Sequence, residues 1–381
     1  MAAHAILSPS GASRWLACTP SARLEEKFPD STSTYSEEGT LAHAVGELIL
    51  RDEPDFKEKL EKLKNSKLGK KYYSDAMYTY ADEYAEYVRG FCTGKHFLFI
   101  EQKLDISGYA RESFGTGDAI IIKDGELIFC DLKYGMGVPV SAVENRQLML
   151  YALGALEEFG FMYDIETVTL NIFQPRLDNI SSWSISVEDL EAWAEKELKP
   201  KAELAWEGKG EKVAGDHCRF CRAAAQCKAL AEHNLDIAKN EFFGQDPDGL
   251  MTVEEVAEVY AKSETLQVWV KLLQDFLFKK ALDGEKVPGY KLVEGRSTRK
   301  YKDEKEVIGA LKEAGFKETE FMTEPTLMGL TALQKSIKKQ AFKDIVEPML
   351  IKPEGAPVLV PDEDKRPEFH SAETDFKDLI G

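Results

Sequence analysis

The sequence predicts an α/β protein, because two kinds of apolar periodicity follow each other along the chain. Between Leu7 and residue 92, apolar residues recur at steps of three and four, which is typical of helices. From Phe97 onward, apolar runs typical of strands cover residues 97–106, 117–134 and 165–175. A helical pattern over residues 142–159 separates the last two runs. Helices and strands therefore alternate in the middle of the chain.

The region before this core is predicted to be helical. Residues 8–28 form a pattern that begins with serines and carries Cys18, and residues 37–50 form a second one with His43 near its middle. Tyrosine-rich helical patterns fill residues 55–92. We expect these segments to pack as a helical layer.

The composition changes near Asp236. An amphipathic helical pattern at 187–206 and a cysteine cluster at 217–227 precede this point. Charged helical patterns and a Pro-rich acidic tail follow it. We therefore expect two domains, residues 1–235 and residues 236–381, the second of them mostly helical.

Length and composition exclude several classes of protein. The 381 residues are 43% hydrophobic and 30% charged, which is typical of a folded protein rather than a disordered one. The 49 Lys and Arg against 67 Asp and Glu give a net charge of −18, which argues against a protein that coats nucleic acid but is compatible with a local basic groove. No apolar stretch approaches the roughly 18 residues of a membrane helix, and residues 1–10 do not resemble a signal peptide. We expect a cytoplasmic protein with no membrane partner.

The segment 117–134 predicts a tight hairpin, because an Asp-Gly pair stands between two apolar runs. A two-residue turn pairs Lys123 with Glu126, and counting back along both strands places Asp118 opposite Asp131. Their Cα atoms would lie about 4.5 to 5.5 Å apart. Two carboxylates at that distance repel each other unless a cation lies between them.

Lys133 is expected on the same face as Asp131, because side chains alternate along a strand. Two carboxylates and an ammonium group suit a Mg²⁺ or Mn²⁺ site that hydrolyses a phosphodiester. From the pattern alone, an edge hairpin whose polar residues face water is the alternative.

Three helical residues are further candidates. Gln147 and Tyr151 are four residues apart and hence lie on one helical face, where they could contact a phosphate or order the lysine. His43 is a suitable Mn²⁺ ligand beside carboxylates. Taken alone, each of the three is more often a packing or surface residue.

Four motifs of the sequence resemble the nuclease domain of the PD-(D/E)XK superfamily, in the branch that includes RecB-like and AddB-like exonucleases. In chain order these motifs are EEGTLAH, GTGD, DLK and QLMLY. The resemblance implies a restriction-endonuclease-like core, in which helices flank a mixed central sheet and a helical insertion lies at the N-terminal side. It assigns metal binding to His43, Asp118 and Asp131. It assigns the role of catalytic lysine to Lys133, the motif after it to Gln147 and Tyr151, and an assisting role to Glu101.

The function that this resemblance implies is that of a metal-dependent DNA nuclease, expected to be an exonuclease in phage replication or recombination, with Mg²⁺ or Mn²⁺ as cofactor. The C-terminal tail resembles that of an uncharacterised phage and prophage protein family. Residues 284–291 lack the pattern of a phosphate-binding loop, so we expect any helicase to be a separate partner. Further expected partners are DNA and phage recombination or single-strand-binding proteins, in the cytoplasm of a bacterial host. The alternative is a non-catalytic DNA-binding or recombination-scaffold protein that keeps the fold.

Cys218, Cys221 and Cys227 follow the spacing C-x₂-C-x₅-C, which lets three thiolates converge on a metal. A closed site needs a fourth ligand, for which Cys18 is the best candidate, and His217 could instead complete a zinc site. The segment around Cys18 resembles the N-terminal cysteine motif of AddB-like nucleases. That resemblance implies a [4Fe-4S] cluster on the four cysteines, with zinc as the alternative.

Two basic runs are candidates for DNA contact. Lysines cluster over residues 57–71, and a second run comprises Arg296, Arg299, Lys300 and Lys302. Such runs are more often solvated faces, but a nuclease of this acidic composition must concentrate its positive charge somewhere.

Overall fold

The computed structural model describes residues 5–29, 34–242, 252–296 and 299–323, and beyond these residues 326–327, 333, 336–337, 339–351, 357–361 and 369. Backbone contacts divide the chain into two units, Met1–Trp269 and Val270–Gly381. All the predicted catalytic, metal-binding and cluster-binding residues lie in the first unit.

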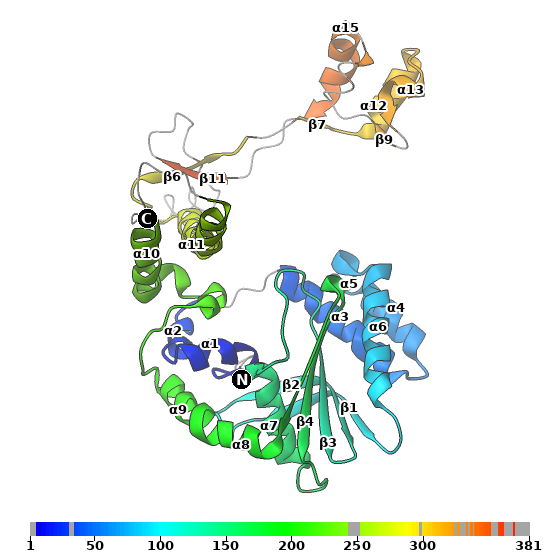
Figure 1. The fold of residues 1–381 in the computed structure, drawn as a ribbon. Helices are drawn as coiled ribbons and strands as arrows, with labels where there is room; N and C mark the ends of the chain where they lie inside the picture. The colour runs from blue at the N-terminus through cyan, green and yellow to red at the C-terminus, as the bar shows by residue number, and fades with distance from the viewer. Residues whose placement is uncertain are drawn as a thin grey trace, which may run out of the picture. The chain divides into compact units, whose positions relative to one another are not determined.

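A five-stranded mixed sheet forms the centre of the first unit (Figure 1). Its strands follow one another in space as they do in sequence: β1 (Phe97–Asp105), β2 (Phe114–Lys123), β3 (Glu126–Leu132), β4 (Thr167–Gln174) and β5 (Asn179–Ser186). All neighbours are antiparallel except β3 and β4, which are parallel. The prediction of an α/β protein is confirmed.

β5 is the strand of this sheet that the sequence analysis missed. It lies at the edge of the sheet, and Trp183 and Ile185 pack against the core between exposed or half-buried serines. The alternation of period two is present, but a short serine-rich strand carries little of the apolar and β-branched signal on which strand prediction depends.

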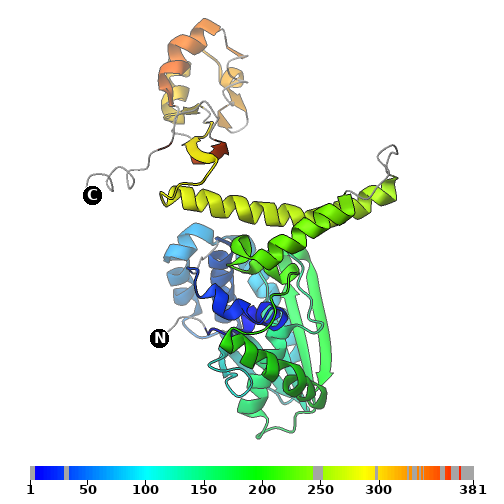
Figure 2. The same ribbon diagram turned by 90° about the vertical axis from the view of Figure 1, so that its left-hand side faces the viewer.

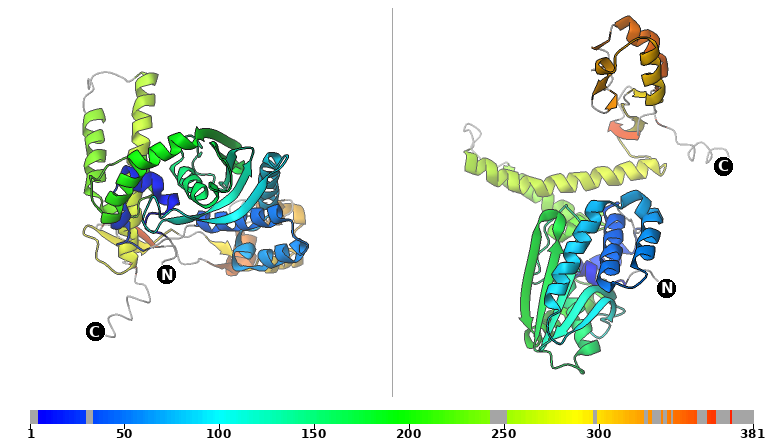
Figure 3. Two further views of the ribbon diagram at one scale, coloured as in Figure 1. Left: turned by 90° about the horizontal axis from the view of Figure 1, so that it is seen from below. Right: turned by 90° about the vertical axis from the view of Figure 1, so that its right-hand side faces the viewer.

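Helices cover both faces of the sheet (Figures 1 and 3). Ile120 points to the face covered by α7 (Arg146–Phe159), and the next residue, Ile121, points to the face covered by α3 (Thr34–Arg51) and α6 (Asp75–Phe91). Because successive side chains of a strand point to opposite faces, two separate apolar cores form. This explains why the central strands are almost continuously apolar.

The remaining N-terminal elements are short. The helix expected over residues 8–28 is broken into pieces, because Pro20 has no N–H group and begins a new helix. The pieces are η1 (Pro9–Gly11), α1 (Ala12–Ala17) and α2 (Ser21–Glu25). Between α3 and α6 lie α4 (Phe56–Asn65) and α5 (Lys67–Tyr72).

The chain after β4 begins with the short turn η2 (Pro175–Leu177). Helical elements follow β5: α8 (Val187–Trp193), the π-helical turn η3 (Ala194–Leu198), α9 (Lys199–Glu207), η4 (Asp216–Phe220), η5 (Ala224–Gln226), α10 (Lys228–Phe242) and the long α11 (Val253–Leu282), which Figure 2 shows in yellow-green. The domain boundary expected near Asp236 falls inside α10. The division by backbone contacts falls after Trp269, inside α11.

The second unit has an apolar core of its own, built around Val307, Leu311 and Phe321. Its described elements are β6 (Tyr290–Glu294), β7 (Lys300–Tyr301), α12 (Glu304–Glu313), α13 (Glu318–Phe321), β8 (Met322–Thr323), β9 (Thr326–Leu327), α15 (Lys339–Ala341), η6 (Phe342–Val346), η7 (Glu347–Met349), β10 (Leu350–Ile351) and β11 (Pro357–Pro361). The strands pair as β6 with β11, β7 with β10 and β8 with β9.

In the part of the chain that the structure describes, no helix combines the length and the apolar character that a membrane crossing requires.

Candidate active site

The β2–β3 ladder has the predicted register and ends one pair before the two aspartates. It runs from Lys123 opposite Glu126 to Ala119 opposite Cys130. The hairpin turn uses left-handed backbone at Asp124 and Gly125, as an Asp-Gly turn requires. Local sequence thus determines which residues reach the end of the ladder.

Asp118 and Asp131 do not form the direct ladder pair that we expected. Instead, Asp118 Oδ2 accepts a hydrogen bond from the backbone N–H of Leu132, at 2.8 Å. A side chain thus occupies the position where the next ladder bond would form, and the paired part of the two strands ends at the candidate site.

The neighbouring β1–β2 ladder is also interrupted at Asp118. Ile100 pairs with Ala119 and Gln102 with Gly117, whereas Glu101 and Asp118 between them are unpaired. Glu101 adopts a left-handed φ of 50°. Such backbone costs a residue other than glycine about 1 to 3 kcal/mol, and within a strand, away from a turn, it is typical of a site where the surrounding structure imposes it.

Three side chains from three elements form a compact group of possible metal ligands. The group comprises His43, Glu101 and Asp118, each of which offers one ligand atom. These three atoms all lie within 4.8 Å of one another. His43 Nδ1 is 3.2 Å from Asp118 Oδ2. His43 and Asp118 are two of the three metal ligands that we predicted. Glu101, expected only to assist, completes the group, whereas Asp131 is not part of it.

The electrostatics of this group favour a cation. Burial lowers the pKa of His43, but the Asp118 carboxylate together with Asp131 outweighs burial and raises that pKa to about 9. Burial and then Asp118 raise the pKa of Glu101 to about 7. Burial also disfavours the Asp118 anion, yet His43, Lys133 and the Leu132 N–H hold the pKa of Asp118 below its ordinary value. A protonated histidine thus balances the acids, and a divalent cation could take its place, since imidazole nitrogen and carboxylate oxygen are Mn²⁺ ligands.

The ligand group lies beside a surface hollow of about 480 Å³. Its lining comes mostly from one side of α3 and comprises Ser36, Gly39, Thr40, His43, Ala44, Glu47 and Glu101. A ligand can therefore reach His43 and Glu101 from solvent.

Asp131 and Lys133 form a second, more buried part of the site. Asp131 is 4% exposed, and Lys133 Nζ lies 2.7 Å from its Oδ2, at ion-pair distance. Oδ2 accepts no hydrogen bond with good geometry from any described residue. Burial raises the pKa of Asp131, and Asp118 adds to this effect while Lys133 opposes it. Burial lowers the pKa of Lys133, but the two aspartates raise it above its ordinary value, so the amine is charged.

Helix α7 holds the lysine through the two residues that we predicted. Asn145 caps the helix by accepting a hydrogen bond from the Leu148 N–H. Lys133 Nζ donates to Gln147 Oε1 at 3.2 Å, and Gln147 Nε2 donates to the Tyr151 hydroxyl at 3.2 Å.

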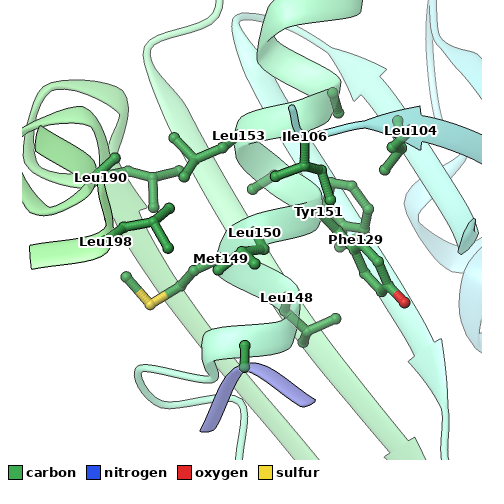
Figure 4. Close-up of a cluster of buried hydrophobic side chains, with 14 of the residues drawn as sticks. Leu104, Ile106, Phe129, Leu148, Met149, Leu150, Tyr151, Leu153, Leu190 and Leu198 are labelled. Atoms are coloured by element: carbon green, nitrogen blue, oxygen red, sulfur yellow. The ribbon is translucent and has the colours of Figure 1, made fainter. Parts of the chain in front are cut away.

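The Tyr151 ring is fixed by packing in the apolar core. It stacks on Phe129 with ring centroids 6.4 Å apart, and Figure 4 shows the two rings side by side between α7 and the sheet. Burial raises the pKa of Tyr151 to about 12, so the phenol is neutral at ordinary pH.

Gln174 is a supporting residue that the sequence analysis missed. It is buried at the end of β4, where its side-chain amide donates to the carbonyls of Gly135 and Val138 and accepts from the Val140 N–H. These bonds fasten the loop that joins Lys133 to α7. A glutamine that ends an apolar strand was the available signal.

The four predicted cysteines line one narrow pocket. Cys18 follows α1, and Cys218, Cys221 and Cys227 lie in and after η4 and η5, so residues about 200 positions apart in sequence meet there. His217, the alternative zinc ligand, lines the same pocket. Burial raises the pKa of Cys218, and burial, followed by Glu25, raises that of Cys221 to about 12.

Polar contacts hold the same two chain segments together around this pocket. Thr19 donates to the carbonyl of Lys209, and Arg23 Nε donates to that of Trp206. Buried Glu25 accepts from the Arg14 side chain and from the Arg222 N–H, each at 2.8 Å.

The basic runs have fewer available cations than the sequence suggests. Lys59, Lys62, Lys64 and Lys71 all form ion pairs with carboxylates. In the second run, Arg299 lies 3.7 Å from Glu347.

Two comparisons bear on the chain as a whole. A family model described as "Protein of unknown function (DUF2800)" matches residues 4–367. A solved structure described as "Crystal structure of SSO0001" aligns with a TM-score of 0.25 and 16% sequence identity, over 56% of this chain and 95% of that one. A likeness at that TM-score carries no argument about fold or function.

Proposed function

This chain belongs to the DUF2800 family, whose function is unknown, and we propose from the geometry of the site that it is a metal-dependent DNA nuclease. One observation carries the proposal: acidic side chains from β1, β2 and β3, a histidine and a charged lysine converge where two ladders are interrupted. We propose with it the finer interpretation of the fold, a restriction-endonuclease-like core. Exonuclease action in phage replication or recombination is the mode that the sequence motifs favour.

His43, Glu101 and Asp118 would hold Mg²⁺ or Mn²⁺. The fit rests on their mixed nitrogen and oxygen donors, on their spacing and on the excess of negative charge. Asp131 lies outside this group and forms an ion pair with Lys133, whose Nζ is 2.7 Å from Asp131 Oδ2, so we propose it only as a further carboxylate near the metal. A bound divalent ion supplies a nucleophilic water and stabilises charge on a phosphoryl group.

Lys133 acts as a fixed positive charge rather than as a base. The aspartates keep its amine protonated, and Gln147 restricts the direction in which the ammonium donates. A preorganised cation in a buried site stabilises the charge that develops on a phosphate during attack. Tyr151 and the core behind it keep Gln147 in place.

We also propose a [4Fe-4S] cluster in the four-cysteine pocket, with zinc as the competing assignment. The four cysteines that line this pocket offer the soft sulfur ligands that an iron-sulfur cluster requires. The preference for a cluster over zinc rests on the resemblance of the cysteine motif to that of AddB-like nucleases. The role of the cluster would be to hold residues 5–29 against residues 206–228.

The test is cleavage of end-labelled single-stranded and duplex DNA, and of closed circular DNA, by the full chain with Mn²⁺. We expect cleavage from ends, loss of cleavage in Asp131→Asn and Lys133→Met, and unchanged cleavage in the control Asp236→Asn, whose side chain is exposed on α10. Equal cleavage by Asp131→Asn and the unsubstituted protein would contradict a catalytic role. DNA binding without cleavage would favour the scaffold function instead.

The cofactor assignment has its own test. Protein purified without oxygen should be brown and contain iron and sulfide in stoichiometric amounts. Colourless protein with one zinc per chain would reject the iron-sulfur cluster.

A further inference from the structure

Arg176, in the turn η2 after β4, makes two contacts that the proposed reaction does not use. Its Nη1 lies 2.9 Å from Glu38 Oε2, and its guanidinium carbon is 4.7 Å from the centre of the Tyr134 ring. The arginine side chain is 18% exposed, so both contacts are partly shielded from water. A planar guanidinium can bind a carboxylate and stack on a ring at the same time, which an ammonium cannot do equally well.

These two contacts join the two halves of the candidate site. Tyr134 directly follows Lys133 at the end of β3. Glu38 lies on α3, five residues before His43. Arg176 therefore connects the helix that carries the predicted metal ligand to the strand end that carries the catalytic lysine.

The position of His43 depends on how both ends of α3 are held. Toward the C-terminal end, Arg51 donates to the carbonyl of Ile100 on β1, and Arg89 of α6 donates to that of Ile49. The N-terminal end is held to α5 through Glu37, and to the sheet through Glu38 and Arg176. His43 lies between these two sets of contacts.

We propose that Arg176 is a positioning residue that sets the distance of His43 from Glu101 and Asp118 by tying α3 to the ends of β3 and β4. This inference rests on the proposed metal site. Residues that hydrogen-bond to a metal ligand typically change metal affinity 10- to 100-fold when substituted. Arg176 acts one contact further from the ligands, so we expect an effect at the lower end of that range, about tenfold.

The sign of the effect distinguishes positioning from charge alone. Arg176→Gln removes a positive charge near a cation site, so Coulomb interaction by itself predicts tighter Mn²⁺ binding. Positioning predicts weaker binding, by about tenfold or more. The two roles of the arginine therefore move the same measured quantity in opposite directions.

The experiment measures the Kd for Mn²⁺ from the electron paramagnetic resonance signal of the free ion, using the full chain after removal of bound divalent ions. We expect the Arg176→Gln variant to bind Mn²⁺ more weakly than the unsubstituted chain, by about tenfold or more. The double variant Arg176→Glu with Glu38→Arg keeps the net charge and the ion pair, so it should recover part of the lost affinity. Arg111→Gln is the matched control, because it breaks an exposed ion pair with Glu203 on other elements. That control should bind Mn²⁺ as the unsubstituted chain does.

Two outcomes would overturn the positioning role alone, and a third would overturn both the metal site and the inference that rests on it. Equal or tighter Mn²⁺ binding by Arg176→Gln overturns the positioning role and leaves the metal site intact. If Arg176→Gln does not fold, the Arg176→Lys variant is measured instead, because it keeps the charge and loses the planar contacts. An affinity of Arg176→Lys for Mn²⁺ equal to that of the unsubstituted chain overturns the inference. Failure of the unsubstituted chain to bind Mn²⁺ contradicts the metal site itself.

Discussion

The buried ion pair between Asp131 and Lys133 makes Lys133→Met a sharp test of the site. Methionine fills a similar volume but leaves Asp131, 4% exposed, without the ammonium 2.7 Å away. Removing one partner of a buried pair typically costs 3 to 5 kcal/mol. Because the Lys133 side chain is 25% exposed, water can replace part of the lost contact, and we expect a loss of about 2 to 3 kcal/mol at pH 8.

The loss should depend on pH and should be reversed by a second substitution. Burial, reinforced by Asp118, already raises the folded-state pKa of Asp131, and removing Lys133 raises it further. A carboxyl group with a raised folded-state pKa destabilises the fold as its anion, so the deficit should shrink as the pH falls toward the unfolded-state pKa of about 4. Asp131→Asn added to Lys133→Met removes the unpaired anion and should restore most of the stability without restoring cleavage.

Tryptophan fluorescence is the appropriate probe, because all five tryptophans lie between residues 15 and 269, in the unit that carries the site. Guanidinium unfolding would be followed in the presence of a chelator at pH 8 and pH 5. Lys201→Met is the control, since it breaks the ion pair between Lys201 of α9 and Glu197 of η3, in which both partners are more than a third exposed. This control should cost less than about 1 kcal/mol. Two results would refute the reasoning: a Lys133→Met variant as stable as the control, or a double variant no more stable than the single one.

Three further predictions concern the other parts of the site. Glu101→Gln should weaken Mn²⁺ binding in calorimetric titration by more than about tenfold, whereas Glu47→Gln, in the same hollow but outside the ligand group, should have a smaller effect. Gly115→Ala would place a Cβ 2.5 Å from Tyr151 Cε1, so it should lower the free energy of unfolding by about 1 to 3 kcal/mol and slow cleavage. The control Gly90→Ala, which has open space at its Cβ, should change neither quantity. Cys227→Ser should lose iron and lower the unfolding temperature, and retention of a full complement of iron would contradict its role as a ligand. Cys92→Ser, on the other side of the sheet, should keep both properties.

Local sequence was sufficient for much of the fold. The change from helical to strand periodicity predicted the class, and the Asp-Gly turn predicted the β2–β3 register as far as Ala119 and Cys130. The same reasoning failed where tertiary packing decides. The serine-rich β5 is a strand because β4 offers it an edge to pair with.

The candidate site was predictable in its membership and less so in its geometry. The spacing of Gln147 and Tyr151 indicated one helical face, and both join the hydrogen-bond chain from Lys133. The left-handed backbone of Glu101 has no sequence signal, because nothing in a glutamate favours that conformation. The pairing of Asp118 with His43 rather than with Asp131 also depends on where α3 packs.

By itself, the sequence of this protein determined the class of its fold, the register of the β2–β3 hairpin, the residues at the end of that hairpin and the types of ligand available, since these follow from contacts between near neighbours in the chain. Tertiary structure alone decided that His43 and Glu101, rather than Asp131, gather around Asp118, that Cys18 meets cysteines 200 residues away, and that Arg176 reaches Glu38. Each of these contacts joins separate elements, and their distances are set by how helices pack on the two faces of the sheet.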